Sequence, residues 1–229
     1  MAEPTATRRQ FGDGPLSQAA AWVYTLLVVE LLLVLVAGPG LVPLVLLDRD
    51  ASNAPLAALC AVPLGPAVAA AAYALHHRRG DLTDLRPAAA FWRGYRSSLR
   101  GALLVWVPYL AWLTVIAIGL ANFRATGLPG WWAVLLVLIA LAATLWCANA
   151  LMVTALFAFR AVDVARLALY FLVRRPGVTI GNAGLLAVAA GVTALGSEAV
   201  LALLGSLLIF LYVLACRPMT AEIQEEFTA

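Results

Sequence analysis

The stretch that decides the fold is the run LSQAAAWVYTLLVVELLLVLVA at residues 16–37, which is 22 residues long and carries one charge, Glu30. A membrane helix needs about 20 apolar residues to cross a hydrocarbon layer of about 30 Å. The run is therefore predicted to span a membrane and to end at the helix breaker Gly38-Pro39-Gly40. The apolar residues 41–47 are too few to cross, so a short interfacial or re-entrant segment is expected there.

The composition of the whole chain agrees with this first run. Of its 229 residues, 64% are hydrophobic and 12% are charged, and the mean hydropathy is +0.94. Soluble domains are about 45–50% apolar and about 25% charged. An ordinary soluble enzyme, a disordered chain and a nucleic-acid-binding domain are thereby excluded. The predicted fold class is an all-α polytopic membrane helical bundle whose main partner is the lipid bilayer.

Five further spans are predicted, at 55–75, 101–121, 131–157, 178–195 and 199–216. The last two come from one apolar region of 39 residues that only Gly196-Ser197-Glu198 interrupts. A single helix of that length would be about 58 Å long, roughly twice the hydrocarbon thickness. Six spans with a tight hairpin are the favoured count, and five spans with one long last helix are the alternative.

The arginines predict how the chain is oriented. All 15 basic residues are Arg, and in the six-span topology only Arg49 and Arg124 lie on the side opposite to the other thirteen. Because positive residues gather on the cytoplasmic side, both termini are expected in the cytoplasm. The single membrane domain is 16–216, between a flexible N-terminal segment (1–15) and a cytoplasmic tail (217–229).

Two segments mix aromatic and basic residues and are predicted to be amphipathic helices at the membrane surface, at about 85–100 and 161–175. Their interfacial side chains are Phe91, Trp92, Arg93, Tyr95, Arg96 and Arg100 in the first and Arg166, Arg174 and Arg175 in the second. Anchoring to anionic lipid is the favoured role. Docking of a partner protein is the alternative, and the two roles are compatible.

Several local strings resemble the YesL family of bacterial membrane proteins. They are GPL at 14–16, PLGPAVAAAAYAL at 63–75 and FWRGYRSSLRGALLVW at 91–106. Ser98 stands where family members often have Asn or another polar residue, so this position adds little to the resemblance. The resemblance implies a location in the bacterial inner membrane. It also implies an association with carbohydrate utilisation, because such genes commonly lie beside sugar ABC importers and glycoside hydrolases. It supplies no catalytic residues.

Glu30 is the leading candidate for an intramembrane site. A charge at mid-membrane costs about 2.5–3.5 kcal/mol on insertion scales, so it marks a functional site unless a neighbouring helix simply hydrogen-bonds it. Its candidate partner is the break in the second span, formed by Pro63, Gly65 and Pro66. Such a break is either the start of a half-helix, as in transporters, or a plain kink. Asn149, inside the fourth span, completes this candidate set.

No catalytic, metal-binding or cofactor motif stands out, and no cofactor is expected. The two histidines, His76 and His77, are adjacent, so they do not share one helix face. The leading expectation is a non-enzymatic accessory component of carbohydrate uptake that binds a sugar ABC transporter. The competing expectation is a small-solute transporter or channel that uses Glu30 and the broken span. An enzyme acting on lipid-linked sugars is the third class. A homodimer is compatible with the apolar helices.

Overall fold

The computed structural model describes residues 15–48, 50–78, 86–195 and 198–227. Within these ranges the regular secondary structure is entirely helical, which confirms the all-α fold class. The α-helices are α1 (Pro15–Leu46), α2 (Ala54–Cys60), α3 (Leu64–His76), α4 (Pro87–Ala121), α5 (Trp131–Leu156), α6 (Ala161–Arg174), α7 (Pro176–Leu195), α8 (Glu198–Leu203) and α9 (Gly205–Phe227). Two short 3-10 turns, η1 (Ala51–Asn53) and η3 (Phe123–Thr126), lie between them.

By length and composition, five helices in the described ranges could cross a membrane, namely α1, α4, α5, α7 and α9. The pair η1–α2 and α3 together adds a sixth candidate, bent by 41° at its break. These helices are typical of a membrane-embedded protein. The expected N-terminal segment up to residue 14 and the turn residues 196–197 lie outside the described residues.

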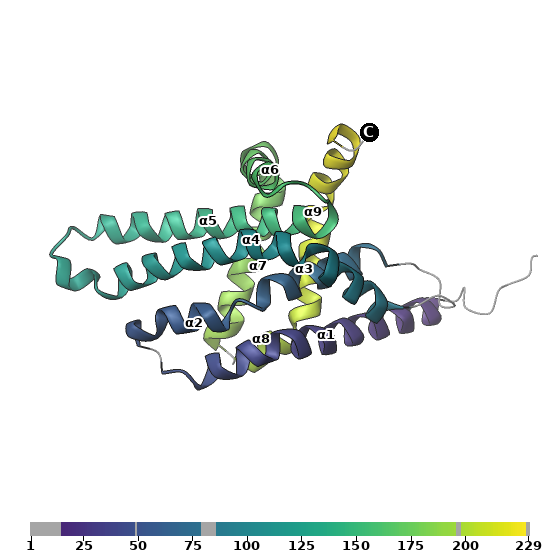
Figure 1. Cartoon of the computed structure of the whole chain (residues 1–229), viewed down its shortest axis with the longest axis horizontal. Coiled ribbons are helices and arrows are strands. Elements are labelled where there is room, and N and C mark those ends of the chain that lie inside the picture. The colour runs from purple at the N-terminus through teal and green to yellow at the C-terminus, as the bar shows by residue number, and fades with distance from the viewer. Residues whose placement is uncertain (1–14, 49, 79–85, 196–197, 228–229) are drawn as a thin grey trace, which may run out of the picture.

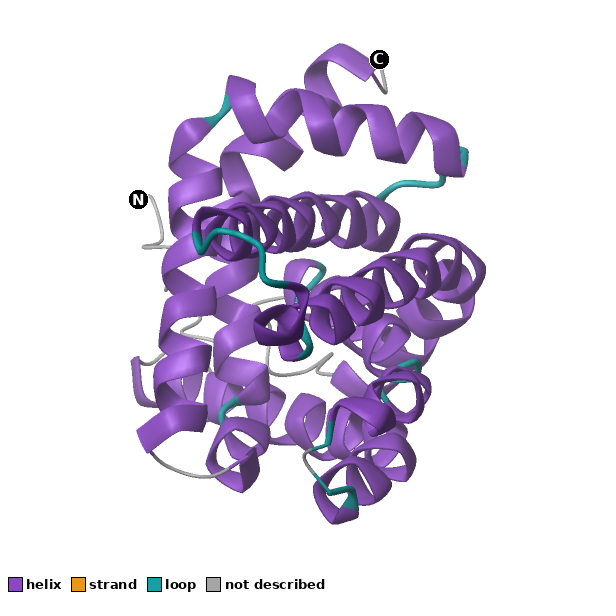
Figure 2. Ribbon diagram, turned by 90° about the vertical axis from the view of Figure 1, so that its left-hand side faces the viewer, coloured by secondary structure: helices purple, strands orange, loops and turns teal. Residues whose placement is uncertain are grey.

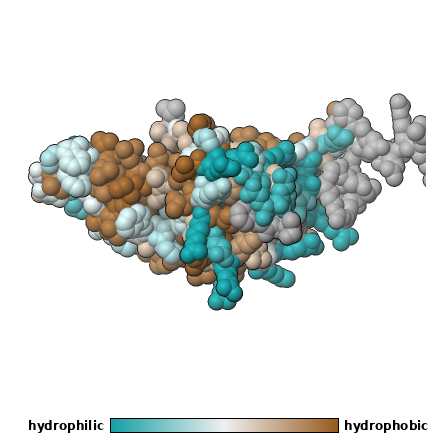
Figure 3. All heavy atoms as spheres, turned by 90° about the horizontal axis from the view of Figure 1, so that it is seen from above, coloured by the Kyte–Doolittle hydropathy of each residue, from teal (hydrophilic) through white to brown (hydrophobic). Residues whose placement is uncertain are grey.

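The helices fall into two sets by direction. Figure 1 shows α1, the α2–α3 pair, α4 and α5 running side by side along the long axis, with α7 and α9 crossing them steeply. Figure 2 views the first set end-on, with the crossing pair upright and α6 lying across one end. Figure 3 shows the molecule from above the view of Figure 1. Hydrophobic residues gather on this surface toward the end that carries η3, and hydrophilic residues gather toward the opposite end.

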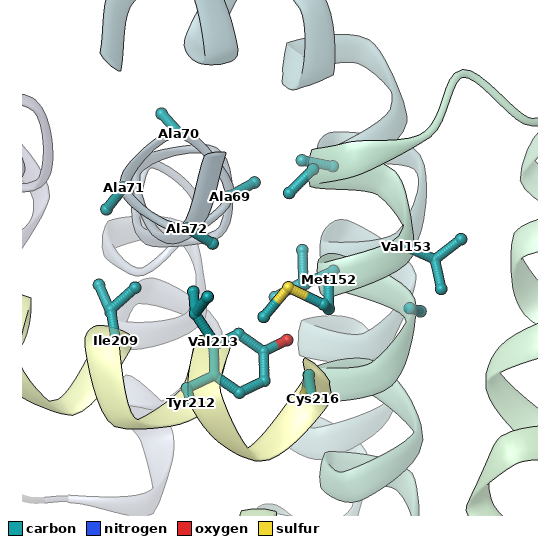
Figure 4. Packing of buried hydrophobic residues seen from close by; sticks show 14 of the residues in the cluster. Ala69, Ala70, Ala71, Ala72, Met152, Val153, Ile209, Tyr212, Val213 and Cys216 are labelled. Atoms are coloured by element: carbon teal, nitrogen blue, oxygen red, sulfur yellow. The ribbon is translucent and has the colours of Figure 1, made fainter. Parts of the chain in front are cut away.

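The core is built around α3, whose sequence is LGPAVAAAAYALH. Ala69, Ala70, Ala71 and Ala72 are all at most 1% exposed, because α1, α4, α5 and α9 surround the helix. Figure 4 shows these alanines pointing outward around α3, with α9 passing close by and carrying Ile209, Tyr212, Val213 and Cys216. Small side chains allow helix backbones to approach closely in a membrane, where hydrophobicity alone does not drive helices together.

The first helix is longer than the sequence indicated. α1 continues through Gly38-Pro39-Gly40 to Leu46, so residues 41–46 extend the helix instead of forming a separate segment. At Gly40 the continued helix comes so close to α2 that an added Cβ would overlap the carbonyl of Cys60. The glycine is therefore a contact point between α1 and the end of α2. Prolines are tolerated in membrane helices where neighbouring groups satisfy the freed backbone.

The expected surface helix at 85–100 and the expected span at 101–121 form one helix, α4. Its buried residues follow one helical stripe from the first part into the second, through Phe91, Gly94, Ser98, Ala102, Val105 and Tyr109. Because this stripe is continuous, the first turns pack on the core instead of lying separately on the membrane surface. An added Cβ at Gly94 would lie 2.7 Å from Cβ of Tyr73, so α4 and α3 touch closely there.

The end of the chain also differs from the sequence expectation. The expected last span at 199–216 is divided between α8 and α9, and α9 continues to Phe227 through most of the expected tail. The tail residues Met219 and Ile223 are 0% exposed and Glu222 is 8% exposed. Residues beyond 216 therefore belong to the packed fold and not to a free tail.

Candidate functional site

Glu30 in α1 caps the start of α9. Its Oε2 accepts a hydrogen bond from the backbone N–H of Ser206, with a donor–acceptor distance of 2.5 Å. The first N–H groups of a helix have no acceptor within the helix, and the helix dipole places partial positive charge there. Gly205 permits this approach, since an added Cβ would lie 2.6 Å from Cδ2 of Leu33 and 3.3 Å from Oε1 of Glu30. The bonded partner of Glu30 is therefore α9 and not the broken second span.

The other carboxylate oxygen of Glu30 is not bonded. Oε1 is buried and has no hydrogen-bond partner. Leaving a buried polar atom unsatisfied typically costs about 1–3 kcal/mol. The carboxyl group thus combines a structural bond on one oxygen with an open position on the other.

The break in the second span is closed by a tryptophan of α4. The carbonyl of Ala61, which lies between α2 and α3, accepts a hydrogen bond of 2.9 Å from Nε1 of Trp106. Gly65 faces the same indole, because a Cβ there would overlap the Trp106 ring. Pro63 caps α3, and Pro66 is buried within its first turns. The same carbonyl also accepts a hydrogen bond of 3.1 Å from the backbone N–H of Leu64, so both of its donors at the break come from the protein.

Asn149 in α5 joins three helices. Its Oδ1 accepts a hydrogen bond of 3.1 Å from Nδ2 of Asn182 in α7, and its Nδ2 donates to the Ala168 carbonyl of α6 at 3.4 Å. Nδ2 of Asn182 also lies 3.7 Å from Sγ of Cys216 in α9. The Tyr212 hydroxyl of α9 donates to the Ala148 carbonyl of α5. Interhelical bonds of this kind hold membrane helices together.

The candidate intramembrane residues consequently lie in three separate places. Glu30 bonds to Ser206, the Pro63 break bonds to Trp106, and Asn149 bonds to Asn182. No hydrogen bond joins one of these groups to another within the described residues. The sequence suggested one site because each of these groups is unfavourable inside a membrane. In the structure each group is hydrogen-bonded to a different neighbour.

The predicted interfacial residues of α4 divide into two kinds. Phe91 is 0% exposed and belongs to the core, whereas Trp92, Arg93, Arg96 and Arg100 are exposed. Tyr95 is partly buried and packs edge to face against Trp92, with ring centroids 5.7 Å apart. One side of this segment therefore packs in the core, and the other side is exposed on the surface.

The predicted interfacial residues at the end of α6 include an ion pair. Nε of Arg175 lies 2.5 Å from Oε2 of Glu222 in α9, and Nε of Arg174 lies 4.0 Å from its Oε1. Arg166 remains exposed on the outer face of α6. Glu222 was missed at the sequence level, although its spacing from Met219 and Ile223 follows a helical stripe.

A second group that sequence reasoning missed is Arg78, which follows α3. Its guanidinium lies over the indole of Trp22 in α1, with Cζ 3.1 Å from the ring centroid. Nε and Nη1 of Arg78 are buried and have no hydrogen-bond partner. Burial lowers the pKa of the Arg78 guanidinium from its ordinary value. The Trp–Arg pairing across α1 and α3 has no local sequence signal.

Comparisons with known proteins return no matching family model, no matching curated protein and no matching solved structure.

Proposed function

We propose that this integral membrane protein is non-enzymatic and acts as an accessory component of carbohydrate uptake by binding a sugar ABC transporter. The carbohydrate part of this proposal is supported by the resemblance of residues 63–75 and 91–106 to the YesL family. The binding part is supported by the outer face of α6, which is the observation that carries the proposal.

The helix α6 has two unlike faces. Its inner face packs on the bundle through Val164, Ala168 and Phe171, all buried. Its outer face exposes Val162, Leu169 and Val173, the last of them 81% exposed, beside the exposed Arg166. A short helix that is apolar on both faces and basic on one of them is suited to contact a second membrane component.

The test is affinity purification of the full-length tagged chain from membranes in which a sugar ABC transporter is produced. A photo-crosslinker placed at Val173 is expected to attach to the permease subunit of that transporter. The matched control carries the crosslinker at Leu128, which is 51% exposed near the start of α5. Crosslinks to lipid alone at Val173, with no permease recovered, would contradict the proposal.

A second candidate function is transport by the chain itself. It is favoured by one observation, the buried and unbonded Oε1 of Glu30. Proteoliposomes containing the pure chain would then carry out solute flux, and Glu30→Gln would abolish it without lowering the amount of folded protein. Flux that is equal in Glu30→Gln and in the unaltered chain would eliminate this candidate.

A further inference from the structure

In Figure 1, α1 begins, α3 ends and α4 begins toward the same end of the molecule. This end carries a basic hollow that none of the roles above uses. Its volume is about 340 Å³. The polar side chains that line it come from all three helices and the segments beside them: Thr25, Tyr73, His77, Arg78, Arg86 and Arg93. None of the described lining residues is acidic.

A second hollow lies on the other side of Arg78. It has a volume of about 260 Å³, and Trp22, His76, Phe210 and Arg217 line it together with Arg78. Here too the described charged residues of the lining are basic. Arg78 therefore separates two neighbouring spaces that both have cationic walls.

The position of Arg78 is fixed before any ligand arrives. Its guanidinium stacks on Trp22, and Trp22 packs edge to face against Phe210, with ring centroids 4.7 Å apart. The negative face of an indole ring attracts a cation held over it. That contact satisfies no N–H donor, so Nε and Nη1 remain without an acceptor.

The missing acceptor should be an anion with several oxygens. Guanidinium groups bind phosphate through paired, charge-assisted hydrogen bonds. Arg78 and Arg93 line the larger hollow from different helices, and Arg217 lines the smaller one. The phosphodiester of a lipid headgroup accepts through two anionic oxygens and a phosphate monoester accepts through three, so either can accept from more than one of these cations.

We propose that the larger of the two hollows beside Arg78 binds an anionic phosphate group, with Arg78 as its principal donor and Arg93 at its rim. Such a group is carried either by the headgroup of an anionic lipid or by a free phosphate compound. This site is independent of any transporter partner.

The test measures lipid binding to the full chain in delipidated detergent solution by native mass spectrometry. Phosphatidylglycerol and the zwitterionic phosphatidylcholine are compared in one arm, and inorganic phosphate and glycerol phosphate are titrated in the other. Arg78→Gln is expected to weaken binding of the phosphate-bearing ligand about tenfold. The matched control is Arg124→Gln, which changes an arginine in η3, away from the hollow, and is expected to leave binding unchanged.

The outcomes separate the two sources of phosphate. Selective loss of phosphatidylglycerol in Arg78→Gln supports the site with a lipid ligand, and selective loss of the soluble phosphates supports it with a free ligand. Because Arg78 is partly buried, Arg93→Gln is measured as well, since Arg93 is exposed and its loss should not impair folding. Unchanged binding in both variants, or an equal loss in Arg124→Gln, would overturn the proposal.

Discussion

Two apolar regions of this molecule are packed in opposite ways. The first is the core around α3, where Ala70 and Ala71 are 0% exposed. The second is the arm, defined as residues 111–141, which comprises the end of α4, η3 and the start of α5. In the arm large apolar side chains such as Trp112, Val115 and Val134 are more than half exposed. In a membrane, hydrophobicity therefore does not decide burial, and small side chains at helix contacts do.

The largest expected effect comes from filling a glycine contact in the core. Gly94→Val would place new atoms against Tyr73, whose Cβ already lies 2.7 Å from the position of an added Cβ. Overpacking of this kind should lower the free energy of unfolding by about 3 kcal/mol. Unfolding titrations with sodium dodecyl sulfate in mixed micelles would measure the change.

The matched control is Gly119→Val in the arm, where an added Cβ would meet nothing within 4 Å. Its free energy of unfolding should stay within about 0.5 kcal/mol of the unaltered chain. If both substitutions lowered the free energy of unfolding equally, the core and the arm would not differ in how tightly their helices pack.

A smaller effect is expected from removing side-chain volume. Met152 in α5 is 0% exposed, so Met152→Ala should leave a cavity and lower the free energy of unfolding by about 2 kcal/mol. Leu138→Ala removes a side chain that is 56% exposed in the same helix, and lipid or detergent would fill the space. Thermal unfolding of both variants in the same detergent compares their stabilities. A larger loss of stability in Leu138→Ala than in Met152→Ala would contradict this prediction.

The smallest expected effect comes from the hydrogen bond between two buried amides, which measures a polar contribution to the stability of the core. A double-mutant cycle on Asn149→Ala and Asn182→Ala should give a coupling energy of about 1 kcal/mol, because the two amides bond directly. A cycle that pairs Asn149→Ala with Thr193→Ala is the control, since the Thr193 hydroxyl bonds within its own helix to Ala189. Coupling as large in the control cycle would mean that the Asn149–Asn182 bond adds nothing specific.

The sequence predicted the features that depend on local chemistry. Runs of about 20 apolar residues indicated the helices, and Pro63 and Pro66 indicated the break between α2 and α3. Helix ends that depend on a distant partner were not predictable. Gly38-Pro39-Gly40 is typical of a helix end, but here it lies inside α1, where Gly40 lets the helix approach the distant Cys60 closely.

The same limit applies to the candidate site. The cost of a charge in an apolar run identified Glu30, but its partner Ser206 lies 176 positions further along the chain. Arg78 was passed over because its two notable features, the Trp22 contact and the unbonded nitrogens, exist only after α1 and α3 have packed. A charged residue is visible in a sequence, whereas the absence of its hydrogen-bond partner is visible only in a structure.

The attachment of α9 at both of its ends has a consequence for biosynthesis. Glu30 bonds to its first turn, and Arg175 pairs with Glu222 near its last turn. Ribosomes make α1 long before α9, so the Glu30 carboxyl group enters the membrane while its N–H donor does not yet exist. Until then a hydrogen-bond donor other than Ser206 must stabilise that group. Insertion of α9 across the earlier helices is thus the step that completes assembly, and a translational pause before residue 205 would prolong the vulnerable state.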